Sequence, residues 1–281
     1  MAPAPTALPR IWVPLPGATV GPVTEPLVQR ADADGVTTLT LNRPDQRNAL
    51  SLAVMDELID LLHLVGTDKG THVVVLAGNG PAFSAGHDLR ELRDNPEPGF
   101  RKELFDRCAE LMLTIVHHRQ PVIAKVHGVA TAAGCQLVAT CDLAIAGEAA
   151  RFATPGVNIG LFCSTPMVAL SRAVPAKQAM EMLLTGEMID ASTAQAIGLI
   201  NRVVPDGQLD AAVADLAATI ADKSPLVLSI GKEAFHRQRE LPLDEAYAYT
   251  ADVMVRNLEA ADAAEGIAAF LDKRPPTWLG R

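Results

Sequence analysis

Hydrophobic residues recur along the chain with two different periods, one typical of strands and one typical of helices. Residues 27–30 and Val36–Leu41 are strand-like runs, and an Asp-Ala-Asp-Gly sequence at 32–35 joins them. This arrangement predicts a β-hairpin. A helix is predicted to begin after Ser51, whose hydroxyl can cap it, because apolar residues then recur at helical spacing as far as Val65.

The next segments alternate between buried strands and helices. Residues 72–77 form a continuous apolar run rich in valine, which is typical of a parallel strand covered on both faces. We then expect a helix at 100–118, a second buried strand at 121–126, a short helix at 132–140 and a third strand at 143–146. Strand and helix repeats with short links predict an α/β core.

After Thr165 the pattern is almost entirely helical. Thr165 is expected to cap a helix whose first residue is Pro166. Further helices are expected at about 176–185, 190–196, 206–223, 226–238, 242–258 and 261–271. The change in pattern predicts a core at 27–205 and a helical oligomerisation region at 206–281, preceded by a proline-rich tail at 1–26.

Composition excludes several classes of protein. The 281 residues are 49% hydrophobic and 20% charged, which is too apolar for a disordered chain. The formal charge is 24 − 33 = −9, so a nucleic-acid partner is not expected, because phosphate contacts need clustered Lys and Arg. There is no run of 18 apolar residues, and therefore no membrane span is predicted.

The four cysteines lie at positions 108, 135, 141 and 163 and include no CxxC pair. A chain of this length does not need disulfides, so reduced thiols and a cytoplasmic location are predicted. The seven histidines show no metal-ligand spacing, and no metal site is expected. Prolines interrupt the apolar stretch of the first 26 residues, which fits neither a signal peptide nor a transit peptide.

Two glycine-rich turns follow predicted buried strands, where α/β folds place their ligands. The first is GNGPAFSAGHDL at 78–89, and the second is HGVATAAGCQL at 127–137. Each leads into a helix whose unpaired N–H groups can point at one oxygen, and two such donors converging on a carbonyl form an oxyanion hole. Taken singly, the first turn is better explained as a simple connection, and the second is also weak evidence for a site.

Together, and in this order, the two turns resemble those of the crotonase (enoyl-CoA hydratase/isomerase) superfamily. The resemblance runs from about residue 26 to residue 278 and includes 47–51, 84–89, 128–137, 152–156, 186–198 and 270–274. The stretches 130–141 and 152–166 resemble one subgroup in particular. The resemblance implies an α/β fold, a crotonase-type ββα spiral core with a helical C-terminal trimerisation region.

The resemblance also implies a ligand, an acyl-CoA or enoyl-CoA thioester whose carbonyl is polarised by the backbone N–H groups of His87 and Ala133. Coenzyme A is then part of the substrate, no separate cofactor is expected, and a homotrimer or a dimer of trimers is implied. The residues implied to contact coenzyme A are Arg47, Ala85, His87, Asp88, Leu89, Ala133 and, from a neighbouring subunit, Lys273. For the two cations, ordinary solvated surface charge is an equally good explanation.

This chain departs from the family's hydratases at both catalytic glutamates. Gln136 and Gly156 stand where the hydratases carry carboxylates that take a proton from water and protonate the α-carbon. Each general acid or base contributes typically ~10²–10⁴ in rate. Gln136 can orient a water but cannot accept its proton, and glycine offers no side chain. The family label is enoyl-CoA hydratase, a lyase of fatty-acid metabolism, yet we predict that efficient hydration is absent.

Few other residues are placed to supply the missing acid or base. The His87 side chain titrates near neutrality, whereas Asp88 is expected to cap the following helix and Cys163 to pack in the interior. Three functions therefore remain open. They are a hydratase-like lyase, other thioester-enolate chemistry such as decarboxylation or thioester hydrolysis, and acyl-CoA binding without turnover.

Overall fold

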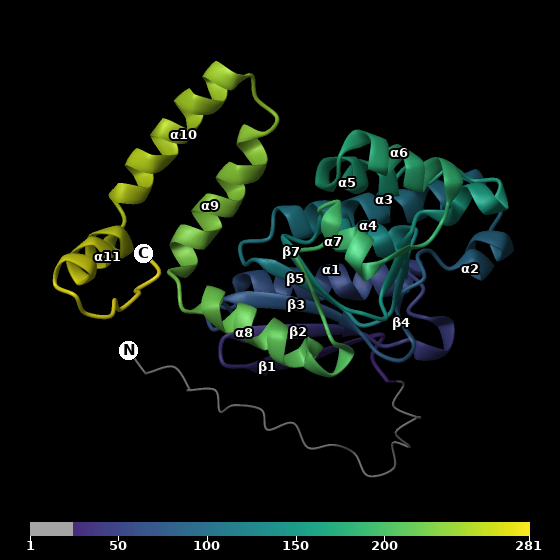
Figure 1. Ribbon diagram of the computed structural model, residues 1–281, viewed down its shortest axis with the longest axis horizontal. Helices are drawn as coiled ribbons and strands as arrows, with labels where there is room; N and C mark the ends of the chain where they lie inside the picture. Colours follow the sequence, from purple (N-terminus) through teal and green to yellow (C-terminus); the bar gives the residue numbers. More distant parts are fainter. Residues whose placement is uncertain (1–24) are drawn as a thin grey trace, which may run out of the picture.

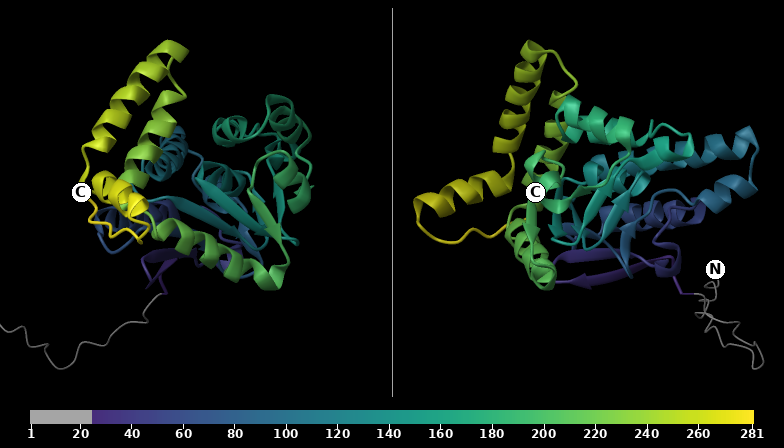
Figure 2. Two further views of the ribbon diagram at one scale, coloured as in Figure 1. Left: turned by 60° about the vertical axis from the view of Figure 1, so that its left-hand side comes forward. Right: turned by 45° about the vertical axis from the view of Figure 1, so that its right-hand side comes forward.

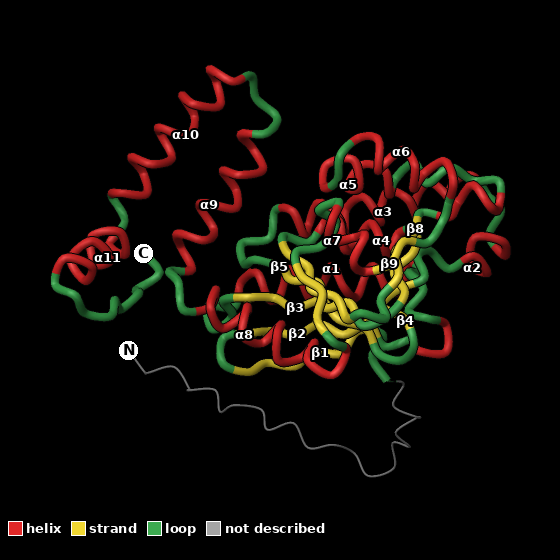
Figure 3. The backbone as a smooth tube through the Cα atoms, in the orientation of Figure 1, coloured by secondary structure: helices red, strands yellow, loops and turns green. Residues whose placement is uncertain are grey.

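Two sheets meet in the core of the computed structural model, which describes residues 25–281 (Figure 1; Figure 3). The larger sheet has the order β1 (Val28–Ala33), β2 (Val36–Leu41), β3 (Val73–Gly78), β5 (Val122–Val126), β7 (Leu143–Gly147) and β10 (Arg202–Val204). The smaller sheet consists of β4 (Ala82–Ser84), β6 (Val129–Thr131), β8 (Arg151–Ala153) and β9 (Ile189–Asp190). The mixed α/β fold and its parallel strands are as predicted.

The β1–β2 hairpin is the antiparallel edge of an otherwise parallel sheet. Asp34 and Gly35 form its turn with φ of 50° and 77°, a region that Asp and Gly tolerate best. Residue 28 pairs with residue 41, so the two strands are in full register. The predicted hairpin is confirmed.

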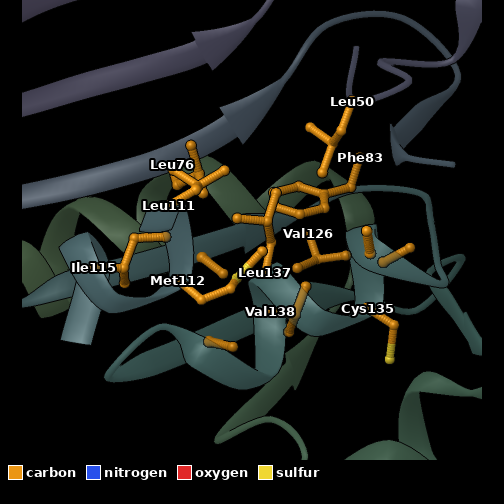
Figure 4. Close-up of a cluster of buried hydrophobic side chains, with 14 of the residues drawn as sticks. Leu50, Leu76, Phe83, Leu111, Met112, Ile115, Val126, Cys135, Leu137 and Val138 are labelled. Atoms are coloured by element: carbon orange, nitrogen blue, oxygen red, sulfur yellow. The ribbon is translucent and has the colours of Figure 1, made fainter. Parts of the chain in front are cut away.

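Helices cover both faces of the larger sheet, and the side chains of β3 alternate between them. Val74 and Leu76 join the main core beneath α1 (Leu52–Thr67) and α3 (Pro98–Val116), whereas Val73 and Val75 contact α8 (Leu209–Ala221). Figure 4 shows part of the main core, in which side chains from α3, α4 (Ala133–Thr140) and the strands interdigitate. A strand buried on both faces explains the continuous apolar run in the sequence.

Most predicted helices are present within two or three residues. Ser51 caps α1 by accepting from the Val54 amide, as predicted. The expected cap at Thr165 is wrong, because its side chain makes no capping hydrogen bond to α5 (Pro166–Ala173). The remaining helices before α8 are α2 (Leu89–Asp94), α6 (Ala176–Thr185) and α7 (Ala191–Ala196).

The chain leaves the sheet after α8 and forms a helical arm of α9 (Pro225–Gln238), α10 (Leu243–Leu258) and α11 (Ala261–Leu271), which stands away from the core (Figure 2). Lys232 of α9 holds the arm to the core. Its Nζ lies 2.6 Å from Asp142 Oδ2 and donates to the Ile115 carbonyl at 2.9 Å. The division at residue 206 stays a prediction. The predicted tail lies outside the described residues, apart from residues 25 and 26.

Candidate functional site

The two glycine-rich turns face each other where the smaller sheet meets α4. A Cβ on Gly86, whose φ is +87°, would lie 2.8 Å from the Thr131 carbonyl oxygen and 3.0 Å from the Ala133 nitrogen. A Cβ on Gly134 would lie 2.2 Å from the Ser84 carbonyl oxygen. Only glycine permits this approach of backbone to backbone. The structure therefore brings together the two segments that the sequence singled out.

Two amide groups at this contact have no acceptor within the described part of the chain. Ala133 is the first residue of α4, so its N–H is among those that a helix leaves unpaired. The neighbours of His87 are fixed, because Leu50 N donates to the Gly86 carbonyl at 2.8 Å and Asp88 N donates to the Leu50 carbonyl at 3.2 Å, while the His87 N–H itself makes no such bond. Two unpaired donors on facing turns are what an oxyanion hole requires.

Ala132, directly before the second donor, adopts a backbone conformation that favours glycine. Its φ is 49° and its ψ is −118°, and its Cβ lies only 2.9 Å from where a Gly86 Cβ would be. Such a conformation costs roughly 1–3 kcal/mol and persists where the surroundings enforce it. Nothing in the sequence pattern identified this strain.

Helix α3 covers the site through three contacts spaced by about one helical turn. The Phe105 ring meets the His87 ring edge-on at 5.2 Å between centroids. Cys108 Sγ then lies 3.7 Å from Gln136 Oε1, and Met112 Sδ lies 3.3 Å from Thr140 Oγ1. We call these the three rungs. The rungs follow one another along α3, starting at the first glycine-rich turn, because residues three or four apart share one helix face. The second and third rungs join α3 to α4.

Residues of the second and third rungs line a cleft of about 1370 Å³, which lies between α9 and the helices α3, α4 and α5. Gln136, Met112 and Thr140 line it on the core side, and Phe235 and His236 line it on the arm side. Gln136 is only 4% exposed, and its side-chain oxygen faces the Cys108 thiol. Burial raises the pKa of this thiol to about 12, so it stays protonated and can donate to that oxygen.

The His87 side chain forms the first rung with Phe105. Both ring nitrogens are shielded from solvent, and the contact of the ring with the Leu50 backbone falls outside ordinary hydrogen-bond geometry. Burial lowers the pKa of the imidazole, and the nearby Leu50 backbone offsets part of that shift. The ring is therefore uncharged at neutral pH.

Gly156, which the resemblance matched to the second catalytic glutamate, is closed in by its own loop. A Cβ there would lie 2.6 Å from the Leu161 carbonyl oxygen and 2.9 Å from Cys163 Sγ. Gly156 N donates to that sulfur at 3.3 Å, and the Gly156 carbonyl accepts from Leu161 N at 2.9 Å. Cys163 is 7% exposed, and burial raises the pKa of its thiol, so it packs in the interior as expected.

The residues expected to contact coenzyme A lie partly around the first turn. Asp88 caps α2 by accepting from Arg90 N at 3.0 Å, as predicted, and it also pairs with Arg43 at 3.2 Å, a partner that the sequence did not reveal. Arg47 is exposed, and its carbonyl accepts from Ala85 N at 2.9 Å. Leu89 is 55% exposed beside them.

Lys273 does not approach this site within one chain. It follows α11, which Figure 1 shows on the opposite side of the molecule from α2. Its expected contact with coenzyme A on a neighbouring subunit stays a prediction.

The four cysteines are free. Over residues 25–281, no three metal-ligating side chains gather into a group, and no helix has the length and apolar character needed to cross a bilayer.

Two facing turns at the ends of parallel strands, together with a helical arm, are the features expected of a crotonase-type protein. The chain belongs to the enoyl-CoA hydratase/isomerase family, which matches residues 31–281. Its relatives include the enoyl-CoA hydratase domain-containing protein 3, mitochondrial, of Rattus norvegicus, which is 46% identical over 277 residues, or 95% of this chain and 92% of that protein. The human protein of the same name is 48% identical over 87% of this chain and 81% of its own length.

A solved structure supports the same assignment. The crystal structure of an enoyl-CoA hydratase of Mycobacterium smegmatis superposes with a TM-score of 0.88 at 49% identity, covering 90% of this chain and 99% of that one. The crotonase fold is thus confirmed, and so is the expected subgroup, that of the enoyl-CoA hydratase domain-containing protein 3. The predicted cytoplasmic location is contradicted, because the rat and human relatives are named mitochondrial. Free thiols, on which that prediction relied, do not distinguish the cytoplasm from other reducing compartments.

Proposed function

We propose that this chain binds acyl-CoA thioesters, polarises their carbonyl with the His87 and Ala133 N–H groups, and does not hydrate enoyl-CoA efficiently. The closed position at Gly156 carries this proposal. A carboxylate there would need the Leu161 backbone and the Cys163 thiol to move, so the loop is built around the absence of a side chain.

The remaining groups do not replace the missing carboxylates. The Gln136 oxygen faces the Cys108 thiol, and an amide cannot take a proton from water at neutral pH. The polarising N–H groups supply about 10²–10³ in rate, whereas the acid and the base are each worth ~10²–10⁴. The same donors stabilise any thioester enolate, so decarboxylation or thioester hydrolysis is the alternative to binding without turnover.

Binding of the nucleotide and assembly belong to the same proposal. Arg47, Ala85, Asp88 and Leu89 lie around the first turn and would line the path of coenzyme A. The arm exposes large apolar side chains, namely Leu243 at 76%, Tyr247 at 72%, Phe270 at 82% and Leu271 at 72%. Exposed apolar surface of this kind marks an interaction site, and a homotrimer or a dimer of trimers would cover it and bring Lys273 to a neighbour.

The test is hydration of crotonyl-CoA and longer trans-2-enoyl-CoAs, followed as loss of enoyl-thioester absorbance. Wild type is compared with Gln136→Glu, and butyryl-CoA binding is measured by calorimetry for both. We expect butyryl-CoA to bind to wild type with turnover far below the usual enzyme range of about 1–10³ s⁻¹. Wild-type turnover within that range would contradict the proposal, as would failure to bind any acyl-CoA. A product panel on saturated, carboxylated and hydroxylated thioesters separates enolate chemistry from binding alone.

A further inference from the structure

Helix α9, the first helix of the arm, lies outside the hydrophobic core of the described residues. Ala234 is its one buried residue, and the cleft separates this helix from α3, α4 and α5. At its C-terminal end, Arg239 donates to the Arg172 carbonyl of α5 at 3.0 Å in an exposed contact. The position of the arm therefore depends on polar contacts with the core.

The strongest of these contacts is made by the ammonium group of Lys232, whose side chain is only 7% exposed. Its Nζ faces three acceptors, Asp142 Oδ2 at 2.6 Å, the Ile115 carbonyl at 2.9 Å and the Gln120 carbonyl at 3.2 Å. An ammonium group has three donors, so each of them has an acceptor. A cation that is buried and fully paired in this way has one defined position.

The acceptors lie at the ends of the two helices that cover and form the candidate site. Ile115 is in the last turn of α3, which forms the second and third rungs with α4. Asp142 follows α4, the helix that begins with the Ala133 donor, and it also accepts from Val122 N at 2.7 Å. A positive charge is favourable at the C-terminal end of a helix, and here one ammonium group serves two helices.

Moving the arm off the core would remove the cation from this junction. The second α9 group beside the carboxylate is the His236 imidazole, whose Nε2 lies 3.6 Å from Asp142 Oδ1. Both groups would leave with the arm, and a buried carboxylate that loses its partner is strongly destabilising. The ends of α3 and α4 would then have to rearrange or admit water. The position of the arm and the spacing of these two helices therefore change together.

We propose that Lys232 is a positioning residue that couples the arm to the acyl-CoA site, so that docking of the arm holds α3 and α4 in the arrangement that binds the ligand. The ligand part of this inference rests on the proposed function. Coupling between two sites is reciprocal, so a thioester bound beneath α3 holds the arm in its docked position in turn. Because the arm is also the proposed contact between subunits, assembly and ligand binding influence each other through this ammonium group.

The test compares wild type with Lys232→Met/Asp142→Asn and with Arg239→Met. The double variant removes both charges of the buried pair, which proteins tolerate far better than the loss of one, and Asn still offers an oxygen to Val122 N. Arg239→Met is the matched control, because it removes the contact of α9 with α5 and leaves the ends of α3 and α4 unchanged. Circular dichroism and urea unfolding establish that each variant is folded.

Butyryl-CoA affinity is measured by calorimetry, and the mobility of α9 by amide hydrogen exchange with and without butyryl-CoA. Coupling between sites typically corresponds to about 5- to 150-fold in affinity. We expect the double variant to bind butyryl-CoA at least about 5-fold more weakly than wild type, and Arg239→Met to bind it as wild type does. We also expect butyryl-CoA to slow exchange in α9 of wild type but not of the double variant, a difference that a merely structural role of Lys232 would not produce.

Three results overturn the inference while wild type binds butyryl-CoA. They are an unchanged affinity of the double variant, an equal loss of affinity in Arg239→Met, and exchange in wild-type α9 that butyryl-CoA does not slow. The third result needs no variant, so the inference stays testable if the double variant does not fold. Failure of wild type to bind any acyl-CoA would overturn the proposed function together with this inference.

Discussion

Ala132 shows how the site depends on the conformation of single residues. Its positive φ is enforced between β6 and α4, next to the Ala133 donor. Glycine adopts this conformation without strain, although it loses about 0.5–1 kcal/mol through its greater freedom in the unfolded chain. Because the strain is roughly 1–3 kcal/mol, we expect Ala132→Gly to raise the free energy of unfolding by about 1 kcal/mol.

Urea unfolding measures this change, and Ala130→Gly is the matched control. Ala130 is fully buried, whereas Ala132 is partly buried, and Ala130 lies within β6, where the backbone is ordinary. Glycine there is expected to lower the free energy of unfolding by about 1 kcal/mol. Equal losses in the two variants would show that Ala132 is not strained.

Gly156 leads to the opposite expectation, because adding a side chain there should lower the free energy of unfolding. A Cβ would stand 2.6 Å from backbone, which cannot swing aside like the end of a flexible side chain. We expect Gly156→Ala to cost about 1–3 kcal/mol of stability and Gly156→Glu to cost more without restoring hydration. Gly207→Ala is the control, since nothing lies within 4 Å of its Cβ and a change within about 0.5 kcal/mol is expected. A stable, hydrating Gly156→Glu variant would contradict this prediction.

Among the elements, the arm depends on one buried carboxylate. Asp262, in the first turn of α11, accepts from Ser224 Oγ at the start of α9 and from Leu279 N at 2.7 Å near the C-terminus. Burial raises the pKa of Asp262, the hydrogen bonds from Ser224, Leu279 and Gly280 lower it, and the net shift is downward. The charged form therefore stabilises the folded state.

The pH dependence of Asp262→Asn follows from this shift. A lowered folded-state pKa means that the contribution is complete above the unfolded pKa of about 3.9 and is lost as pH falls through the folded value. Charge-assisted bonds of this kind are worth about 1.5–3 kcal/mol. We expect the difference in unfolding free energy between wild type and Asp262→Asn to be constant from pH 8 to 5 and to shrink only below about pH 4. A difference that already falls near pH 6 would implicate another group.

The elements also show how far the sequence alone could predict the structure. Helices such as α1 and α11 were predictable because a dozen residues repeat one period, and the two turns because glycine is required where backbones touch. The four strands of the smaller sheet span two or three residues each, too few for a period to appear. Nor could sequence spacing show that Leu161 and Cys163 close over Gly156, because that contact depends on how a loop folds back.

For the whole molecule, the exposed arm predicts assembly. Phe270 and Leu271 are 82% and 72% exposed at the end of α11. We expect light scattering to give wild type the mass of a trimer or twice that mass, and Phe270→Glu/Leu271→Glu to reduce it, because buried charges oppose association. Leu64→Glu on α1, where the side chain is 56% exposed, is expected to leave the mass unchanged. A monomeric wild type would contradict the proposed assembly.

The two amides that face each other at the oxyanion turns belong to the main chain, and this has an evolutionary consequence. A substitution can remove a catalytic side chain, but only a change to proline removes a backbone N–H. The proposed activation of the carbonyl therefore depends little on which side chains residues 87 and 133 carry. A family member that loses a catalytic side chain would therefore keep the two backbone amides. New acids or bases at positions such as His87, Cys108 or Gln136 would then act beside amides that are already in place.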